Sequence, residues 1–534
     1  MGLNIPSLQI ISFILSLLCL ASAMLLLKLS NGKKKKELSI SKPNKSPMPK
    51  SYPIIGSFLA ILENSGRILQ WTSDILLSTS HQTFSLHLPF GQRLIFTANA
   101  ANVQHILKSN FHVYEKGDFI RTALKDILGD SIVNVDGDEW KFQRQISIHE
   151  FNTKSFRKFV GTVVDSELAD RLIPILKTAA AKRSVLDLQD ILQRFAFDNI
   201  CQVAFGYDPA YLLPSLPQAE FTDAFDEAVK LCSERMNAFT PQIWKVKRAL
   251  NIGSEKQLRI AVNHAREFVK EIIRKKKKPN SNKNNNNADV ADKTLESADL
   301  LSRFLNSNHS DEDFVTDVVM GFILAGRDST SAALTWFFWL LSHHPEVENE
   351  ILKEISELRQ GNDIDDQTSR GNDIPEAKEM IYTHAALCET MRLYPPLPMD
   401  QKEAVSDDVL PDGTVVKKGT RVGYHIYAMG RVETVWGKDW AMFSPTRWLE
   451  REEGAEKWKF VGRDQYTYPV FQAGPRICLG KEMAFLQMKR AVAEVLRRFR
   501  VVPVMEKGTE PILITKVGIK MKGGFPVRIE ERAQ

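Results

Sequence analysis

Cysteine is scarce in this sequence, and its distribution argues against two common kinds of small scaffold. Only five cysteines occur among the 534 residues, and they are odd in number and widely spaced. No CxxC pair or Cys/His cluster is present, so neither a disulfide framework nor a zinc site is indicated. The pattern instead fits a reducing compartment. Most of the five are expected to be inert core thiols, as free cysteine usually is.

A strong net charge and an internal repeat are also missing. The formal net charge is +6, which is small for this length, whereas a nucleic-acid reader usually carries more positive charge gathered on one face. Nucleic acid is therefore not an expected partner. The hydrophobic content of 43% and the charged content of 25% are ordinary for a globular protein, and the chain is long enough to bury a large core.

Charged residues are absent from residues 1–27, where the sequence is strongly apolar. Residues 8–27 have about the length that a helix needs to cross a bilayer. Lysines 33–36 follow, which predicts a cytoplasmic flank and a retained transmembrane anchor over residues 1–30. A cleaved signal peptide is the alternative, since residues 21–23 resemble a cleavage site. A signal peptide, however, carries its positive charge before the apolar run.

The rest of the chain divides by composition. Residues 31–56 are basic and proline-rich, which predicts an extended linker because proline cannot continue a helix. In the body, residues 57–534, most apolar residues recur at the three- and four-residue spacing of helices. Alternating stretches at 83–99 and 410–427 predict strands. Residues 274–293 are polar and of low complexity, so we expect a disordered loop, with a nucleic-acid-binding arm as the alternative.

A second long apolar run lies at residues 313–346. It is long enough to span a membrane, but Arg327 and Asp328 stand in its middle, and each costs about 2.5–3.5 kcal/mol on insertion scales. The run therefore predicts a buried central helix of a large globular fold, with polar residues where the helix lines a cavity.

The most informative cysteine stands in FQAGPRICLG, residues 471–480. A buried thiol in a turn is one interpretation, and a metal ligand is the other. Glycines let backbone N–H groups approach and tune a thiolate ligand of haem iron. An aromatic residue shields the sulfur, an arginine pairs with a haem carboxylate, and a helix that begins just after the cysteine adds its positive dipole end. The five residues are Phe471, Gly474, Arg476, Cys478 and Gly480.

Their spacing, F-x-x-G-x-R-x-C-x-G, resembles the haem-binding loop of the cytochrome P450 family. Further motifs follow in the family's order over almost the full length. The resemblance implies a mainly α fold with a long central helix, a helical body that encloses the haem, and small β-sheets. It also implies a thiolate-ligated haem b, with Cys478 as the axial ligand of the iron.

Two further motifs extend the resemblance. ETMR matches E-x-x-R, which implies that Glu389 and Arg392 share a helix face and join Arg447 in a structural network. DEWKFQR resembles W-x-x-x-R, which implies that Trp140 and Arg144 face a haem propionate. Taken alone, a Glu/Arg pair at this spacing is more often a surface ion pair.

Two positions depart from the family pattern. Lys402 stands where relatives often carry a propionate-binding arginine, and lysine cannot make the same bidentate contact. AGRDST, residues 325–330, resembles the oxygen-activation motif, with Asp328 and the hydroxyl after it as a proton relay. Ser329 replaces the usual threonine and rotates more freely, and Thr330 follows it. The alternative is that Asp328 and Ser329 only satisfy backbone groups at a helix kink.

The resemblance implies a monooxygenase that uses dioxygen and a small apolar substrate. Because no flavin or nicotinamide motif is evident, the electrons must come through a partner, NADPH–cytochrome P450 reductase. Lys481, Lys489 and Arg490 are candidate contacts for an acidic partner, and a merely solvated basic face is the alternative. The anchor implies a single-pass protein of the endoplasmic reticulum membrane with a cytosolic catalytic domain.

Several stretches, among them AGRDSTSAALTWFFWLLS, resemble the plant fatty-acid ω-hydroxylase branch. This implies hydroxylation at the terminal carbon of a long aliphatic chain, which must be held end-on because a terminal methyl resists oxidation. Phe322 is a candidate lining residue, and Arg121 or Lys125 a candidate partner for a fatty-acid carboxylate. Relatives that oxidise jasmonoyl–amino acid conjugates or sterol side chains leave those substrates open.

Two other classes of function remain as alternatives. Some relatives rearrange hydroperoxides without a reductase, but they tend to lose the acid–hydroxyl pair that Asp328 and Ser329 form. A membrane-anchored haem-binding sensor needs no catalysis, and the complete set of motif residues argues against it. The sequence leaves open whether oxidation continues beyond the alcohol, the pathway and the oligomeric state.

Overall fold

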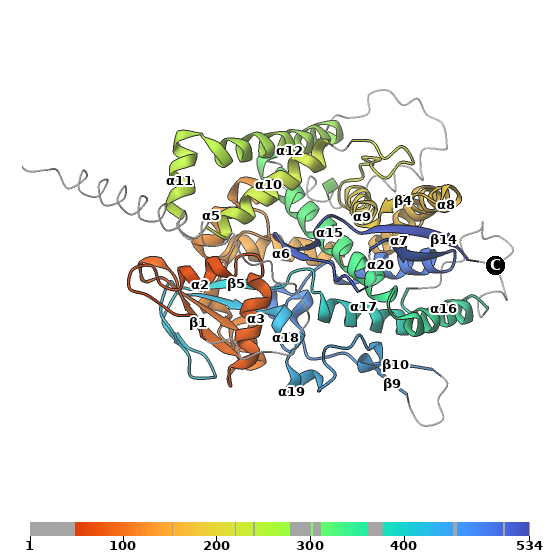
Figure 1. Cartoon of the computed structure of the whole chain (residues 1–534). Coiled ribbons are helices and arrows are strands. Elements are labelled where there is room, and N and C mark those ends of the chain that lie inside the picture. The colour runs from red at the N-terminus through yellow and green to blue at the C-terminus, as the bar shows by residue number, and fades with distance from the viewer. Residues whose placement is uncertain are drawn as a thin grey trace, which may run out of the picture. The chain divides into compact units, whose positions relative to one another are not determined.

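A 30-residue helix, α15 (Glu312–Leu341), forms the centre of the fold (Figure 1). Most of its residues are buried, and it packs along α9 (Leu188–Phe205). The run at 313–346 thus forms the buried central helix that its two charges predict. The computed structural model describes residues 48–532 except 152, 219, 239–240, 278–300, 303–310, 361–376, 452–456 and 506–507.

Local chemistry sets the start of α15. The Asp311 carboxylate accepts a hydrogen bond of 3.0 Å from the backbone N–H of Phe314 and so caps the first turn. Glu312 and Asp313 place negative charge at the positive end of the helix dipole. Soon after α15 ends, Pro345 opens α16 (Pro345–Gln360), because proline fits the first turn of a helix.

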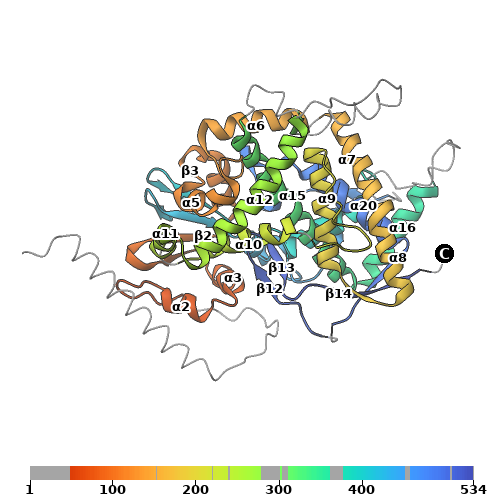
Figure 2. The same ribbon diagram turned by 90° about the horizontal axis from the view of Figure 1, so that it is seen from above.

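The remaining helices surround α15 or lie beside the sheets (Figures 1 and 2). Those that pack against α15 include α5, α9, α12, α17 and α20. In chain order the described helices besides α9, α15 and α16 are α2 (Phe58–Glu63), α3 (Ile68–Ser78), α4 (Ala100–Gln104), α5 (Gly117–Leu128), α6 (Gly137–Phe151), α7 (Lys154–Glu167), α8 (Ile173–Lys182), α10 (Glu220–Met236), α11 (Pro241–Leu250), α12 (Gly253–Lys277), α17 (Ile381–Leu393), α18 (Ile426–Met429), α19 (Glu433–Trp436) and α20 (Lys481–Leu496).

The β-structure consists of small sheets, the largest with five strands in the order β1-β2-β8-β5-β3. β2 and β8 run parallel, and β5 runs antiparallel to β8 with Lys402 opposite Val422. The stretches at 83–99 and 410–427 supply β1, β2, β7 and β8, as their alternation predicts. The described strands are β1 (Thr83–His87), β2 (Arg93–Thr97), β3 (Tyr114–Glu115), β4 (Val185–Asp187), β5 (Asp400–Ala404), β6 (Asp408–Val409), β7 (Val415–Val416), β8 (Arg421–Tyr424), β9 (Leu449–Glu450), β10 (Lys459–Phe460), β11 (Phe499–Pro503), β12 (Leu513–Thr515), β13 (Ile519–Met521) and β14 (Pro526–Glu531).

Two hydrophobic clusters divide the interior, and the loop at 471–480 connects them. The larger cluster gathers the apolar faces of the helices around α15, and the smaller one lies between α3 and the five-stranded sheet. Phe471 packs against the larger cluster, whereas Ala473 is a buried member of the smaller. Removing both apolar surfaces from water holds the cysteine loop at the junction of the two clusters.

Two boundaries differ from those predicted from the sequence. Residues 274–277, expected to begin a disordered loop, form the last turn of α12. Arg274 there pairs with Glu312 at 2.8 Å, and the Lys276 ammonium donates to the carbonyl of Phe205 at 2.7 Å. Residues 52–56, assigned to the linker, form a turn that the N–H of Ser57 ties to the carbonyl of His87 at 2.7 Å.

The predicted membrane segment is not tested by these coordinates. The anchor at 1–30, the linker up to residue 47 and residues 278–293 of the predicted loop lie outside the described residues. Within the part of the chain that the structure describes, no helix is both long and apolar enough to span a bilayer.

Candidate active site

The cysteine loop has the geometry of a ligand cradle. The N–H of Cys478 donates to the carbonyl of Phe471 at 2.8 Å, which closes the loop on itself. Gly474 adopts a φ of +64°, and a Cβ there would overlap the carbonyl oxygen of Leu107, so only glycine fits. Gly480 then precedes the first residue of α20. The sulfur therefore stands at the N-terminus of a 16-residue helix.

The environment of Cys478 favours a thiolate that has a positive partner. Burial raises the pKa of the thiol above its usual value, while the N–H groups of Gly480 and Lys481 and the charge of Arg144 oppose that rise. The side chain is nevertheless accessible, whereas Cys201, Cys232 and Cys388 are buried. Among the described residues, Cys478 is thus the one cysteine that an incoming metal can reach.

The ring of Phe471 is held in place at the start of the cysteine loop. It packs against that of Phe485 on α20, with centroids 5.2 Å apart, and the ammonium of Lys481 lies 5.9 Å from the centre of the Phe471 ring. The shielding of the thiolate that the sequence motif implies for Phe471 stays a prediction.

Arg476 of the cysteine loop has two neighbours of interest, Trp140 and Arg144 on α6. Arg476 donates to a carboxylate oxygen of Asp136 at 2.6 Å and to the carbonyl of Val135 at 3.0 Å, and its guanidinium lies 4.5 Å from the centre of the Trp140 ring. Arg144 is different, because its buried Nε has no hydrogen-bond partner among the described residues. Burial lowers the pKa of Arg144, while the nearby Cys478 raises it. An anionic ligand there would supply the missing partner.

Lys402 shares its carboxylate partner with a residue that sequence analysis missed. Lys402 on β5 is only 3% exposed, and its Nζ lies 3.7 Å from Oδ2 of Asp400. The Nζ of Lys116 lies 3.7 Å from the other oxygen, Oδ1. Tyr424 and Gln472 also donate to Asp400, at 2.8 and 2.7 Å. Burial alone raises the pKa of Asp400, but the two lysines and these hydrogen bonds hold it below its usual range.

These groups carry a surplus of positive charge. Arg144, Arg476, Lys116 and Lys402 have only two carboxylates, those of Asp136 and Asp400, as ion-pair partners among the described residues. Buried charge is costly unless it is paired. The surplus of two positive charges suits haem b, which carries two carboxylates, so the residues present fit that cofactor.

One face of α15 is accessible at the middle of an otherwise buried helix. Ala325 is exposed there, and the hydroxyl of Ser329 donates to the Ala325 carbonyl at 2.6 Å. Thr330 lies on another side of the helix and is 4% exposed. Gly326 does not contribute open space, because a Cβ there would lie 2.7 Å from the side chain of Ile200 on α9. Its small size allows the two helices to pack, while Ala325 borders the accessible region.

Asp328 is half-buried and has two cations nearby. Its Oδ1 lies 3.7 Å from Nη1 of Arg327 and 3.9 Å from Nζ of Lys520, and this oxygen accepts no hydrogen bond within the described part of the chain. Ser329 follows it in the chain, and the Ser329 hydroxyl is bonded to the Ala325 carbonyl.

The E-x-x-R motif lies at the centre of a buried network. Glu389 accepts two hydrogen bonds from Arg392, at 2.8 and 2.7 Å, and one from Arg447 at 3.2 Å. The indole of Trp448 donates to the same carboxylate at 2.9 Å, and the backbone N–H of Ser444 at 3.0 Å. The network ties α17 to the segment 444–448, so its position favours a structural role.

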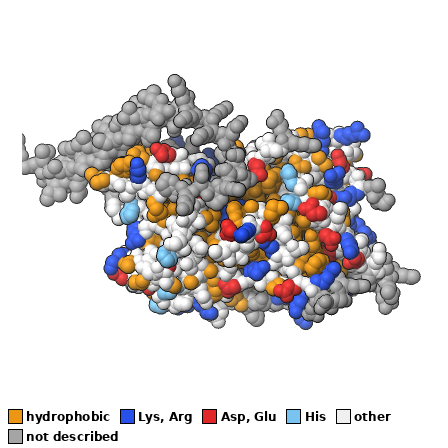
Figure 3. All heavy atoms as spheres, turned by 60° about the horizontal axis from the view of Figure 1, so that its bottom comes forward, with side chains coloured by type: hydrophobic (Ala, Val, Ile, Leu, Met, Phe, Trp, Pro, Cys, Tyr) orange, Lys and Arg blue, Asp and Glu red, His pale blue; other side chains and the backbone are white. Residues whose placement is uncertain are grey.

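Two of the three cations predicted to contact a partner already bind groups within the protein. Lys489 is 5% exposed and donates to the carbonyl of Ala377 at 2.7 Å. Arg490 pairs with Asp165 at 2.5 Å and donates to the carbonyl of Gly161. Burial therefore rules out Lys489 as a contact for an acidic partner, whereas Arg490 is half-buried and already paired within the protein. Figure 3 shows another face of the molecule, on which basic, acidic and apolar side chains are interspersed.

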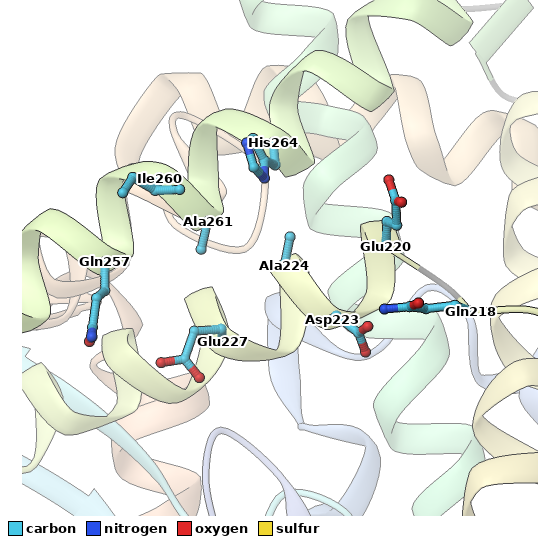
Figure 4. Close-up of a pocket in the computed structure, with 9 residues that line it drawn as sticks. All are labelled: Gln218, Glu220, Asp223, Ala224, Glu227, Gln257, Ile260, Ala261 and His264. Carbon is cyan, nitrogen blue, oxygen red and sulfur yellow. The ribbon is translucent and has the colours of Figure 1, made fainter.

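A separate groove of about 450 Å³ lies between α10 and α12 (Figure 4). Its lining includes Glu220, Asp223, Glu227 and His264 and is open to solvent. No group of three or more His, Cys, Asp or Glu side chains that could hold a metal ion occurs in the described part of the chain. The groove therefore does not compete with the cysteine loop as a metal centre.

Comparison with known proteins agrees with this site. The family model described as Cytochrome P450 matches residues 46–525. The chain belongs to the cytochrome P450 family. Cytochrome P450 94A2 of Vicia sativa is 59% identical to it over 493 residues, which cover 92% of this chain and 93% of the relative. Cytochrome P450 94A1 of Vicia sativa is 54% identical over 91% of both chains, and cytochrome P450 94B1 of Arabidopsis thaliana is 45% identical over 91% and 92%.

Family membership confirms the resemblance found in the sequence, the mainly helical cytochrome P450 fold and the class of enzyme. The chain is a monooxygenase with a thiolate-ligated haem b. When bound, the haem supplies the activation of dioxygen, and the protein supplies binding, orientation and protons. Members of the family draw their electrons from redox partners.

Loss of Glu389 is expected to destabilise the fold strongly. In Glu389→Ala the Arg392 guanidinium stays buried without a carboxylate, which costs about 3–5 kcal/mol for a broken buried pair. Urea unfolding of the purified protein measures the loss. Glu357→Ala is the control, because Glu357 forms a solvent-exposed pair with Lys353 at 3.9 Å. Similar losses in the two variants would contradict the role of the network.

Haem affinity is expected to fall as the pH rises above about 8. Burial lowers the pKa of Lys402 to about 8 in the haem-free chain, so the lysine loses its proton there, whereas a bound carboxylate requires the charged form. Haem titration of the haem-free protein below and above pH 8 measures this. Lys402→Arg keeps its charge and should show a flatter dependence. Equal pH dependence in the two proteins would count against Lys402.

The protonation of Lys402 also affects the stability of the haem-free protein, and here a rise in pH is favourable. The pKa of Lys402 is about 8 in the folded chain against an ordinary value of 10.5, so the unfolded chain binds more protons between these values. The stability that Lys402 contributes to the haem-free protein therefore rises with pH across that window.

Proposed function

We propose that this monooxygenase hydroxylates the terminal carbon of a fatty acid, using dioxygen and electrons from NADPH delivered by NADPH–cytochrome P450 reductase. One oxygen atom enters the substrate C–H bond and the other leaves as water, which consumes two electrons and two protons. The single observation that carries the proposal is the accessible face of α15, where the Ser329 hydroxyl adjoins apolar residues and Asp328 precedes it in the chain. The similarity to the fatty-acid ω-hydroxylase branch supports the substrate.

The roles proposed for the individual residues follow from the geometry above. Cys478 is the axial ligand, Phe471 shields it, and Gly474 and Gly480 let the backbone approach. Asp328 and Ser329 move protons, with Thr330 as a buried neighbour that packs the helix. The haem carboxylates are held by Trp140, Arg144, Lys402 and Arg476, to which the structure adds Lys116.

An apolar wall continues from the proton-delivering face. Phe322, Ala325 and Ser329 stand three and four residues apart and so share one face of α15. The Phe322 ring lies 6.0 Å from that of Phe151, which in turn packs 5.3 Å from Phe156. Aromatic walls without polar groups suit an alkyl chain, and a chain confined end-on presents its terminal methyl.

Of the two candidate carboxylate partners, Arg121 is now favoured. Lys125 is already paired with Asp130 at the surface, whereas Arg121 has no ion-pair partner among the described residues. Arg121 lies on α5, one turn before Lys125, and α5 packs against α15. Apart from a longer-range attraction to Glu115, the Arg121 guanidinium is available for the carboxylate of a fatty acid.

Membrane association is part of the proposal. The apolar residues 1–27 support an anchor in the endoplasmic reticulum membrane, with the catalytic domain in the cytosol. At the end of α11, Val246, Leu250 and Ile252 expose 45%, 63% and 50% of their surface. Large apolar side chains gathered at one place on a surface favour contact with lipid.

Substrate titration tests the proposal directly. The oxidised haem protein is titrated with a long-chain fatty acid, a jasmonoyl–isoleucine conjugate and a side-chain-hydroxylated sterol, and displacement of the axial water shifts the Soret band. A shift with the fatty acid, followed by an ω-hydroxylated product with NADPH and reductase, is the expected result. A shift with the conjugate or the sterol alone would reassign the substrate, and turnover with a hydroperoxide alone would reassign the reaction.

Arg121→Ala is expected to weaken fatty-acid binding by about 1 kcal/mol, or roughly fivefold, as for a partly exposed ion pair. The affinity for the corresponding fatty alcohol should not change, because it has no carboxylate. Lys125→Ala serves as the matched control on the same helix. Equal losses for the acid and the alcohol, or a larger effect at Lys125, would rule out Arg121 as the carboxylate partner.

A further inference from the structure

Three carboxylates surround one arginine where α7 packs against α9 (Figure 2). Nη1 of Arg171 lies 3.2 Å from Oε2 of Glu167 and 3.2 Å from Oδ2 of Asp198. The same guanidinium donates two hydrogen bonds to Asp208, which lies at the surface. Glu167 is 2% exposed and Asp198 is 0% exposed. Two buried carboxyls therefore share a guanidinium whose shortest bonds go to a third, exposed carboxylate.

The backbone is irregular at the residue that the carboxylates share. Glu167 is the last residue of α7, and a π-helical turn, η4 (Leu168–Leu172), follows it and carries Arg171. Such turns are rare, occur mostly as single insertions in α-helices and are frequent at functional sites. An unusual turn and an unusual group of charges thus coincide.

The charges of this cluster do not balance. With all three carboxylates ionised, one guanidinium would leave a net charge of −2, and buried charge is costly unless it is paired. The other described groups that face the cluster are Cys201, Tyr207, Tyr211 and Glu271, together with four cations that are bonded elsewhere, namely Arg194 to Asp190, Lys276 to the carbonyl of Phe205, Arg327 to Asp226 and Arg490 to Asp165. A proton on the buried pair of carboxyls therefore lowers the energy of the cluster.

The hydrogen bonds indicate which carboxyl holds that proton. Asp198 accepts the backbone N–H groups of Tyr211 at 3.2 Å and Leu212 at 2.8 Å, which favours its ionised form. Glu167 accepts the side-chain amide of Gln202 at 3.2 Å and receives no backbone N–H group among the described hydrogen bonds. Burial and the neighbouring Asp198 raise the pKa of Glu167 to about 8, although its arginine partner opposes the rise. The two carboxyls interact directly, so they titrate as a pair with the proton mainly on Glu167.

The cluster holds segment 207–217, which leads from α9 into α10, in a strained form. The N–H of Ala210 donates to Asp208 at 2.9 Å, in addition to the two N–H groups that Asp198 accepts. Ala210 and Leu216 have φ angles of +55° and +44°, which residues with a Cβ rarely adopt. Such strain persists only where the surroundings enforce it. The segment is therefore expected to relax when its anchor is lost.

We propose that Glu167 and Asp198 form a pH-sensitive latch, in which one shared proton keeps the two buried carboxyls together and lets Asp198 hold segment 207–217, and loss of that proton releases the segment. With both carboxyls ionised, their repulsion favours the solvated, open arrangement. Because the segment leads into α10, which packs against α12 and α5, its release loosens the attachment of α10. The inference does not depend on the substrate or on the reaction.

The direction of the pH effect follows from the two states of Glu167. In the open state its carboxyl is solvated and ionises near the ordinary value of 4.5, whereas in the closed state its pKa is about 8. Between these values opening releases one proton. The opening constant therefore rises with pH by up to about tenfold per unit and levels off above about pH 8.

Hydrogen–deuterium exchange of the complete haem protein tests the latch. Peptides that cover residues 207–217 report opening, after correction for the intrinsic dependence of exchange on pH. Between pH 6 and pH 8 their protection is expected to fall by up to about a hundredfold and then to level off. In Glu167→Gln, which is uncharged at every pH, protection should be nearly constant over that range and should exceed that of the wild type at pH 8.

Urea unfolding at pH 8 provides a second readout with an unusual sign. Glu167→Gln should be more stable than the wild type, whereas removal of one partner of an ordinary buried ion pair is destabilising. Asp170→Asn is the matched control, because Asp170 lies on the same π-helical turn and is exposed. It should keep the wild-type dependence of exchange and stability on pH. The haem content of each variant shows whether it is folded.

Two outcomes would overturn the latch. Protection of residues 207–217 that does not change between pH 6 and pH 8 in the wild type would show that no proton is released on opening, and this measurement needs no variant. A slope in Glu167→Gln equal to that of the wild type would assign the proton to another group.

Discussion

The buried guanidinium of Arg392 is the charge around which the haem-side half of the molecule is organised. Removing such a group from water is costly, and here the whole cost is met within the protein. Glu389 bonds it in bidentate fashion, and the carbonyls of Gly430 and Met442 accept two of its three remaining protons. Three segments of the chain, α17 and those around Gly430 and Met442, must therefore come together around this charge.

Packed aromatic rings connect the network around Arg392 to the cysteine loop. Trp448 donates to Glu389, and its ring lies 4.7 Å from that of Tyr468, whose hydroxyl bonds the carbonyl of Cys388 at 2.9 Å. Tyr468 is three residues before Phe471, where the loop begins. The position of the sulfur thus depends on contacts more than ten residues away in sequence. A thiolate ligand requires such rigid support, because its donation is set by fixed backbone N–H groups.

The parts of the fold and site that lie close together in sequence were predictable, and the parts that depend on long-range contact were not. The central helix followed from one apolar run with two charges, and the cysteine loop from five residues within ten. Lys116, Asp400, Asp226 and Lys520 carry no such signal, because their partners lie in distant segments. Lys489 was misjudged for a related reason, since charge alone does not tell which face of α20 packs inward.

The two adjacent small residues of α15 also differ in a way that the sequence does not predict. Ala325 and Gly326 are adjacent and equally suited by size to leave open space, yet only Ala325 borders the accessible region. A turn of 100° per residue separates their directions, so Gly326 meets Ile200 on α9 instead. The residues of the motif predict its chemistry. Which of its small residues borders the accessible region, however, depends on how the neighbouring helix packs.

The two charged networks near the site differ in net charge. Around Arg144, Arg476, Lys116 and Lys402 the cations outnumber their carboxylate partners by two, so an anionic ligand lowers the energy of the buried charges whenever it is present. Around Asp328 two cations face two carboxylates, and no external anion is required. A surplus suits groups that hold a cofactor permanently. In the balanced group, the Arg327 guanidinium is hydrogen-bonded to Asp226 at 2.6 Å, so its buried charge is paired within the protein.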